Sequence, residues 1–190
     1  MKNLYLIVIL LIAISCNQPE TVKKTQSYKQ TYSEETIKKG KAISAQTFKK
    51  MSGALKSKMT SGGVQEAINY CSENAYSLVD SISTQNNVSI KRVTLKFRNP
   101  DNKPDSLETV ALNNYESKKE TKPVVFSNSY DDRYFAPIKT KGLCLTCHGV
   151  VGDNISEEDY SLIKEKYPTD KAVDYKADEL RGIWSITFKK

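Results

Sequence analysis

The chain has 190 residues, with 29 Lys and Arg against 22 Asp and Glu, which gives a formal net charge of +7. This length corresponds to one ordinary domain with short appendages. Four Cys and a single His are present, which excludes His-rich metal enzymes and confines any imidazole chemistry to His148. The charge is mostly dispersed Lys with no Arg-rich stripe, so we expect no nucleic-acid partner.

The N-terminus has the layout of an export signal. A short basic start is followed by an unbroken apolar run from Leu4 to Ile14, and small residues then lead to Cys16. This order is typical of a secretory signal peptide, and the run is shorter than the ~20 residues that a membrane-spanning helix needs. The end of the run resembles a bacterial lipobox, which implies cleavage before Cys16 and attachment of a lipid to it. Ala13 stands where Leu is commoner, so an ordinary signal for soluble export remains the alternative.

These patterns divide the chain into three parts. Residues 1–15 are the predicted signal peptide, residues 16–32 the lipidated Cys16 and a polar, flexible tether, and residues 33–190 one folded domain. We therefore expect an exported protein on the periplasmic or cell-surface side of a membrane, anchored to it through Cys16. Such compartments are oxidising, so any thiol that survives there needs a reason.

Two long helices open the predicted domain. The first begins at Ser33-Glu34-Glu35 and runs to about Lys58, and its expected inner face is formed by Ser44, Phe48, Met51, Leu55 and Met59. Ser61-Gly62-Gly63 should break the helix. The second runs over 64–83 with an apolar stripe at helical spacing. Cys71 lies in the middle of that stripe.

Strands dominate the rest of the chain. Alternating apolar residues predict a strand over 88–98, followed by a turn over 99–105 and a short helix over 106–116. Two strands are expected over 124–126 and 133–138, a helix over 156–166 and a last strand over 182–189. Strands grouped after helices indicate an antiparallel α+β domain.

Cys144-Leu145-Thr146-Cys147-His148 fits C-x-x-C-H, the attachment signature of c-type haem. Two thiols at this spacing add to the two vinyl groups of a porphyrin, and the following imidazole binds the iron. Cys144 and Cys147 are therefore the candidate attachment residues of a covalent haem c, and His148 is the candidate proximal ligand. Gly149 is expected to let the chain leave the ring in a tight turn.

Two other interpretations compete with haem at this motif. Cys144 and Cys147 could form a redox disulfide, although no parallel βαβ pattern surrounds them. A structural zinc ion is the second alternative, since Cys71, Cys144, Cys147 and His148 together make a Cys₃His set.

The second axial ligand of the iron stays open from the residues alone. The sulfur candidates are Cys71, Met51 and Met59, and a Lys or an empty position are further alternatives. All three sulfur residues also fit a plain role as core filler.

Several segments of the chain resemble a family of c-type haem domains with a PAS-like fold. They are, in order, Ala67–Ala75, Arg92–Pro100, Asn102–Asp105, Pro137-Ile138, Cys144–Gly149, Tyr167-Pro168 and Asp178–Gly182. The resemblance covers about residues 35–188. It implies a PAS-like antiparallel sheet with flanking helices and a haem in its pocket. The family's His/Cys axial pair maps onto His148 and Cys71.

We expect a haem-based redox or gas sensor that acts through a separate redox or signalling partner. An electron-transfer cytochrome is the alternative, and a zinc- or disulfide-stabilised binding lipoprotein is a third interpretation. No enzymatic activity is expected, because there is no second His for a distal base and no nucleophile motif with supporting context. Arg98, Arg133 and Lys141 are candidate partners for the haem propionates.

Overall fold

The computed structural model describes residues 27–190. The predicted signal peptide, Cys16 and most of the predicted tether lie outside the described residues, so the lipid anchor stays a prediction. Within the described part of the chain, every helix is too short or too polar to cross a bilayer.

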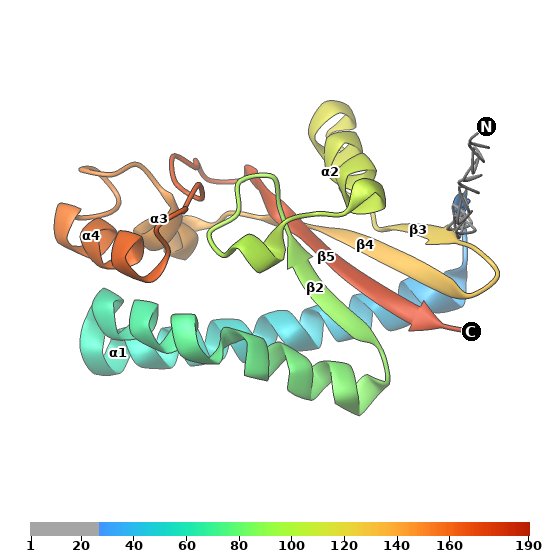
Figure 1. The fold of residues 1–190 in the computed structure, drawn as a ribbon, viewed down its shortest axis with the longest axis horizontal. Coiled ribbons are helices and arrows are strands. Elements are labelled where there is room, and N and C mark those ends of the chain that lie inside the picture. Colours follow the sequence, from blue (N-terminus) through green and yellow to red (C-terminus); the bar gives the residue numbers. More distant parts are fainter. Residues whose placement is uncertain (1–26) are drawn as a thin grey trace, which may run out of the picture.

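Four α-helices and a five-stranded antiparallel sheet make up this part of the chain (Figure 1). The elements in chain order are β1 (Lys29–Thr31), α1 (Glu34–Asn86), β2 (Ser89–Val93), a 3₁₀ turn (Pro100–Asn102), α2 (Ser106–Lys118), β3 (Val124–Ser127), β4 (Asp131–Lys139), α3 (Gly142–His148), α4 (Glu157–Lys166) and β5 (Leu180–Lys189). The strand order is β1-β3-β4-β5-β2. The predicted α+β, PAS-like architecture with flanking helices is confirmed.

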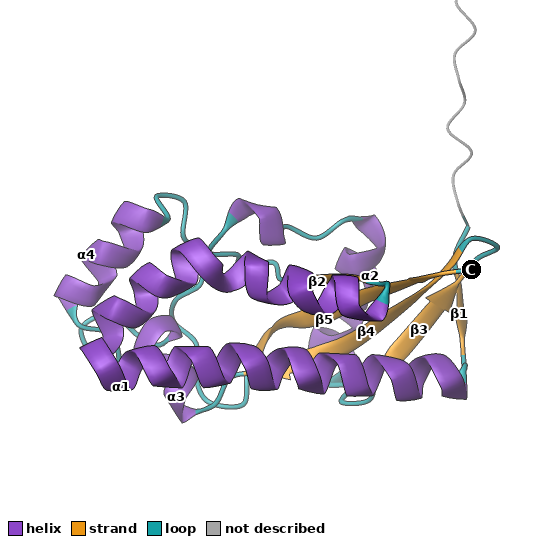
Figure 2. Cartoon of the chain, turned by 90° about the horizontal axis from the view of Figure 1, so that it is seen from below, coloured by secondary structure: helices purple, strands orange, loops and turns teal. Residues whose placement is uncertain are grey.

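Helix α1 is a hairpin of two antiparallel arms. Gly62 and Gly63 leave helical geometry, and Gly63 has a φ of 74°, a left-handed value that favours glycine. The arms then run side by side, as Figure 2 shows. Lys50 Nζ donates to Ser81 Oγ across them at 2.6 Å. The two predicted helices and their break are therefore confirmed.

The inner face of the first arm matches the prediction at Ser44, which is buried, and at Met51, which packs against the core, but it differs elsewhere. Phe48 is 50% exposed, whereas Thr36, Gly40 and Thr47 are buried. The arm lies so close to β4 that a Cβ on Gly40 would come within 2.4 Å of the Tyr134 ring. Close approach to an aromatic side chain selects small residues, which a search for large apolar residues cannot detect.

Gly40→Ala tests this close approach. We expect it to destabilise the fold by about 1–3 kcal/mol, because the added methyl group overpacks a filled interface. Gly53→Ala in the same arm is the matched control, since nothing lies within 4 Å of its Cβ position. The control should stabilise the helix by up to ~1 kcal/mol. Urea denaturation of both variants measures the difference, and equal midpoints would contradict the packing argument.

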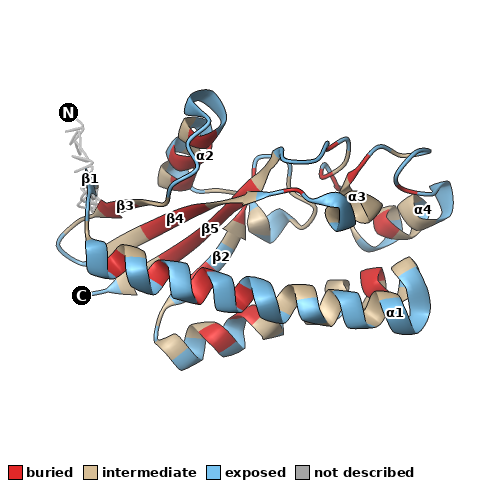
Figure 3. Ribbon diagram, turned by 180° about the vertical axis from the view of Figure 1, so that it is seen from behind, coloured by how far each residue is buried: buried red, intermediate tan, exposed pale blue. Residues whose placement is uncertain are grey.

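Buried apolar residues form a separate core on each face of the sheet, and Figure 3 marks the buried positions in red along the ribbon. The arms of α1 cover one face of the sheet, where Ile82 and Ile186 are fully buried. Helix α2 covers the other face, where Leu112 and Phe135 are fully buried. A third group lies at the end of the molecule where α3 and α4 meet the tip of α1. We call this group the end cluster; its fully buried members are Ile68, Ile155 and Ile163.

Three segments differ from the predicted elements. Strand β2 ends at Val93, five residues before the predicted strand end, because Thr94 N–H donates to Asn102 O and the chain turns away from the sheet. Strand β1 lies within the stretch predicted as tether and pairs with β3. The short helix α3 was not predicted either. Helix α2, helix α4 and strands β3, β4 and β5 match the predicted positions within a few residues.

Candidate functional site

Helix α3 presents the whole Cys-x-x-Cys-His motif. Cys144, Cys147 and His148 lie three and four residues apart, so they share one side of a single helical turn. All three side chains are half-buried. The helix begins after Lys141 and ends at Gly149, whose N–H donates to Leu145 O at 2.8 Å.

The segment Ala172–Tyr175 fixes the orientation of His148. Its Nδ1 lies 2.8 Å from the carbonyl oxygen of Ala172, so the ring is assigned as the tautomer in which Nδ1–H donates. A backbone hydrogen bond joins the same two segments, since Tyr175 N–H donates to His148 O at 3.0 Å. The Tyr175 ring meets the imidazole edge-on at 6.3 Å. Among the described residues no group hydrogen-bonds to Nε2, whose lone pair is therefore available to a ligand.

The surroundings keep this imidazole neutral. Burial, followed by the positive charges of Arg181 and Arg98, holds the pKa of His148 well below its ordinary value, although the bond to Ala172 acts in the opposite direction. Only a neutral imidazole can bind a metal ion through Nε2. The site therefore supplies the form of His148 that a metal requires.

Gly149 is needed for a different reason from the predicted one. Its φ is −76°, an ordinary value for any residue. A Cβ at this position would, however, lie 2.3 Å from Asn154 Oδ1. That oxygen accepts the N–H of Val150 at 3.1 Å. The glycine thus admits the side chain that closes the turn after α3.

Arg98, in the loop after β2, and Asp170, in the loop after α4, pair beside the site and support it. Arg98 Nε donates to Asp170 Oδ1 at 3.2 Å, and its Nη2 donates to the carbonyl oxygens of Cys147 and Ala172. Asp170 is buried and also accepts the N–H of Ala172 at 2.9 Å. Arg98 and Asp170 therefore hold Ala172, whose carbonyl orients His148, and Arg98 also binds the backbone of Cys147.

Asp170→Asn should remove much of this support. The substitution leaves the charge of Arg98 without its buried partner, so we expect a loss of about 3 kcal/mol in the free energy of unfolding. Asp174→Asn is the control: Asp174 is exposed and has a φ of 63°, which Asn tolerates. Its stability should stay within about 0.5 kcal/mol of the parent. Guanidinium denaturation followed by circular dichroism separates the two, and an unchanged Asp170→Asn midpoint would refute this supporting role.

Cys71 lies on the second arm of α1, where the chain passes the end cluster. Its side chain is half-buried, and burial raises the pKa of its thiol, while the nearby charge of Arg92 lowers it and the neighbouring Cys147 raises it further. Cys147 packs against the end cluster, to which the second arm of α1 contributes Ile68, one helical turn before Cys71, so α1 and α3 bring the two thiols to the same end of the molecule. Met51, by contrast, packs against the core under the sheet, so its sulfur is occupied as core filler.

Two arginines at the site were not predicted. Arg92 is the last but one residue of β2 and Arg181 the second residue of β5, and their charges, with that of Arg98, lower the pKa of His148. Neither Arg92 nor Arg181 pairs with a carboxylate among residues 27–190, and the Nε of Arg181 is buried without a hydrogen-bond partner. The alternation of residues along a strand predicts only which face of the sheet a side chain lies on, so it does not indicate that these two residues converge.

The other candidate propionate partners are placed differently. The guanidinium of Arg133 is bound by Asp105 and Glu108, at 2.7 Å each, beside α2. Lys141 is exposed and precedes α3 without a side-chain cap bond. Of the three candidates, only Arg98 has a side chain that hydrogen-bonds to the Cys-x-x-Cys-His helix in the described part of the chain.

The structure gives no support to a disulfide or a zinc site. Cys71, Cys144 and Cys147 are free thiols. Within the described range, no three side chains of His, Cys, Asp or Glu gather as a metal-binding group. The four residues of the Cys₃His alternative therefore share one region without forming a tetrahedral cage.

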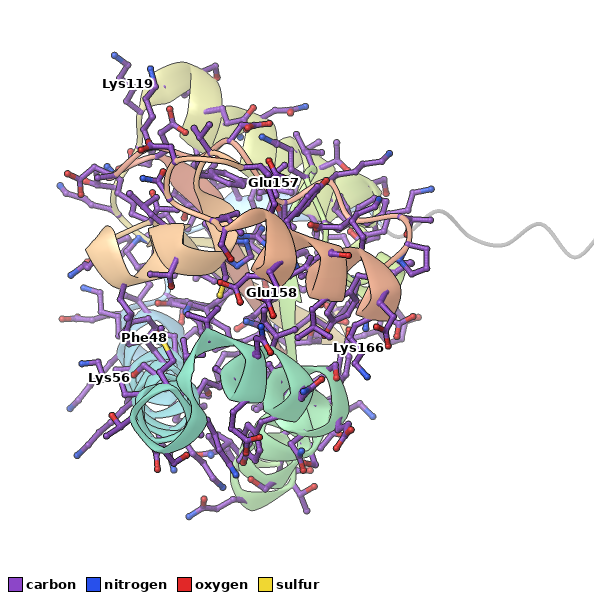
Figure 4. All side chains as sticks on the ribbon, turned by 90° about the vertical axis from the view of Figure 1, so that its left-hand side faces the viewer. Phe48, Lys56, Lys119, Glu157, Glu158 and Lys166 are labelled. Atoms are coloured by element: carbon purple, nitrogen blue, oxygen red, sulfur yellow. The ribbon has the colours of Figure 1, made fainter. Side chains whose placement is uncertain are left out.

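Figure 4 looks onto this end of the molecule, where Glu158 of α4 points toward the tip of α1. Gln65 Nε2 of that tip donates to Glu158 Oε1 at 2.8 Å. Ile68 of α1 and Ile163 of α4 meet beneath this contact in the end cluster. Helix α4 thus ties the arm that bears Cys71 to the segment that carries α3.

Comparison with known proteins identifies the family. No curated protein matches the sequence. Among solved structures, the fold is similar to that of the cyanobacterial haem protein Tll0287, with a TM-score of 0.64 and 24% sequence identity. The match covers 84% of this chain and 98% of the cyanobacterial protein. The Tll0287-like family matches residues 18–189, which spans both arms of α1, the whole sheet and the Cys-x-x-Cys-His helix, and the chain accordingly belongs to the Tll0287-like family.

Proposed function

We propose that the protein binds one haem c covalently through Cys144 and Cys147, with His148 and Cys71 as axial ligands. The observation that carries the proposal is the orientation of His148, whose Nδ1–H is fixed by Ala172 and whose Nε2 is left free beside the Cys pair. The similar cyanobacterial protein Tll0287 is named a haem protein, which supports the same cofactor here. When bound, the haem would supply one-electron chemistry and a site for small gas molecules.

The residues of the site fit this group. The only imidazole is neutral and oriented, and the three thiols beside it are free. A coordinated thiol loses its proton outright, so the raised pKa of Cys71 does not oppose ligation. The unpaired arginines and the buried, unpartnered Nε of Arg181 also call for an anionic group at this place.

We further propose that the haem senses redox state or a small gas at a membrane surface, with Cys16 as the lipid anchor on the outer side. A thiolate stabilises ferric iron and lowers the reduction potential. Cys71 would be the ligand that is released when a bound haem is reduced, and its release would make room for a small gas molecule. The signal would then pass to a separate redox or signalling protein. We assign no catalytic role, because His148 is the only His and is already engaged.

An electron-transfer cytochrome is the second candidate. Leu143 and Val150 flank the motif and are 38% and 40% exposed. An attached haem edge would thus lie near solvent, where electrons can pass to a partner.

Spectra of the purified protein test the proposal. A pyridine haemochrome spectrum should show a haem with two thioether links, and the reduced protein should bind CO, which shifts its Soret band. A blank haemochrome would refute haem attachment. A haem that never binds CO but exchanges electrons rapidly with itself would favour the carrier over the sensor. For the anchor, Cys16→Ser should move the protein from the membrane to the soluble fraction.

A further inference from the structure

Three guanidinium groups converge beside His148. Arg98 shares the carbonyl oxygen of Ala172 with the imidazole. Arg181 stacks on the Tyr175 ring, with its Cζ 5.3 Å from the ring centroid, and that ring meets the imidazole on its edge. Arg92 enters from the end of β2, opposite Trp184 of β5. All three charges therefore belong to the surroundings of the candidate iron ligand.

The charges around this ring do not balance. Asp170 neutralises Arg98. Arg181 donates only to the carbonyl oxygen of Lys96, at 3.3 Å, and its Nε remains buried without an acceptor. No hydrogen bond or ion pair joins the Arg92 side chain to another residue in the described part of the chain. Two half-buried cationic groups are therefore left without a counter-ion beside His148.

An unpaired charge that is partly withdrawn from water is costly, so an anion should complete this place. The deficit is two negative charges, and a haem carries two propionates. Planar guanidinium groups bind carboxylates in a bidentate manner, which suits this role. Burial also lowers the pKa of Arg181 to about 10, as expected for a cation that lacks its partner.

We infer that Arg92 and Arg181 bind the two haem propionates, while Arg98, already paired with Asp170, positions the Cys-x-x-Cys-His helix. This inference rests on the proposed haem attachment. Arg92 and Arg181, which the fold brings together from two strands, thus take the role of propionate partners predicted for Arg133 and Lys141. Arg133 is already paired with Asp105 and Glu108, and Lys141 is exposed. The positive cluster thereby has a specific anionic ligand.

Infrared difference spectra of the redox transition test the inference. The full-length protein is produced with haem labelled by ¹³C at the propionate carboxyl groups, so that the label identifies the propionate bands. These bands should shift in Arg92→Gln and in Arg181→Gln. The loss of one positive charge should also favour ferric iron roughly tenfold, a fall of about 59 mV in reduction potential. Arg181→Lys keeps the charge, so it should retain the potential while the bands still move.

Lys189→Gln is the matched control. Lys189 is exposed at the other end of β5, eight residues from Arg181 and thus about 26 Å away along the strand. The Lys189→Gln substitution removes one positive charge, but it should leave the propionate bands and the reduction potential unchanged. A lowered potential with unmoved propionate bands in both Gln variants would overturn the inference, as would no change in either. A haemochrome spectrum of each sample separates this failure from a failure of haem attachment, which would remove the haem from the parent as well.

Discussion

Cys71→Ala is expected to change the colour and the redox behaviour of the protein. The parent should show the low-spin ferric EPR spectrum of a His/thiolate haem, and the variant should lose it. An anionic ligand stabilises ferric iron, so its removal should raise the reduction potential. We expect a change of at least a hundredfold in the reduction equilibrium, which corresponds to about 118 mV or more for one electron. Absorption, EPR and redox titration measure the three effects.

Two matched variants make this result interpretable. Cys71→Ser keeps the size of the side chain, so it separates lost ligation from lost packing. Met59→Leu removes one of the two half-buried methionines of the α1 hairpin and should leave all three measurements unchanged. If Cys71→Ala retained the parent EPR spectrum, the axial assignment would be wrong. A parent-like Cys71→Ala together with an altered Met59→Leu would move the ligand to the first arm.

The sequence predicts the elements better than their junctions. Periodicity and the Ser61-Gly62-Gly63 break placed both arms of α1, because those features are local. The end of β2 was misplaced, since alternation of side chains continues to Arg98 while the hydrogen bond from Thr94 to Asn102 turns the chain away. Such a bond depends on a contact eight residues distant, which alternation does not encode.

The same limit applies to the candidate site. The motif Cys144–His148 is contiguous, so its residues could be named from the sequence. Ala172, whose carbonyl orients His148, carries no chemical signal in its side chain. Arg92 and Arg181 come together only because β2 and β5 are neighbours in the sheet. Asp170 and Arg98 lie 72 residues apart, and only the fold pairs them.

Cys144→Ala/Cys147→Ala should remove covalent haem and unfold one end of the protein rather than the whole. The two cores on the faces of the sheet contain large buried side chains that do not depend on α3. The end cluster has only three buried residues within the described range, Ile68, Ile155 and Ile163. Their burial contributes roughly 1.5–3 kcal/mol each, whereas ordering the backbone costs about 1–2 kcal/mol per residue. The unpaired charges of Arg92 and Arg181 weaken this end further.

Hydrogen exchange followed by mass spectrometry measures the effect segment by segment. In the haem-free variant, we expect amides over 64–75 and 142–175 to exchange at least a hundredfold faster than in the parent, because opening this end no longer removes a porphyrin from its contacts. Amides of β4, β5 and α2 should keep most of their protection. Asp170→Asn, which retains the haem, serves as the comparison for a loosened loop alone. Parent-like protection over both segments in the haem-free variant would show that α3 and α4 need no porphyrin. Uniform loss across the sheet would show instead that the two ends fold as one cooperative unit, with the cofactor as part of its only core.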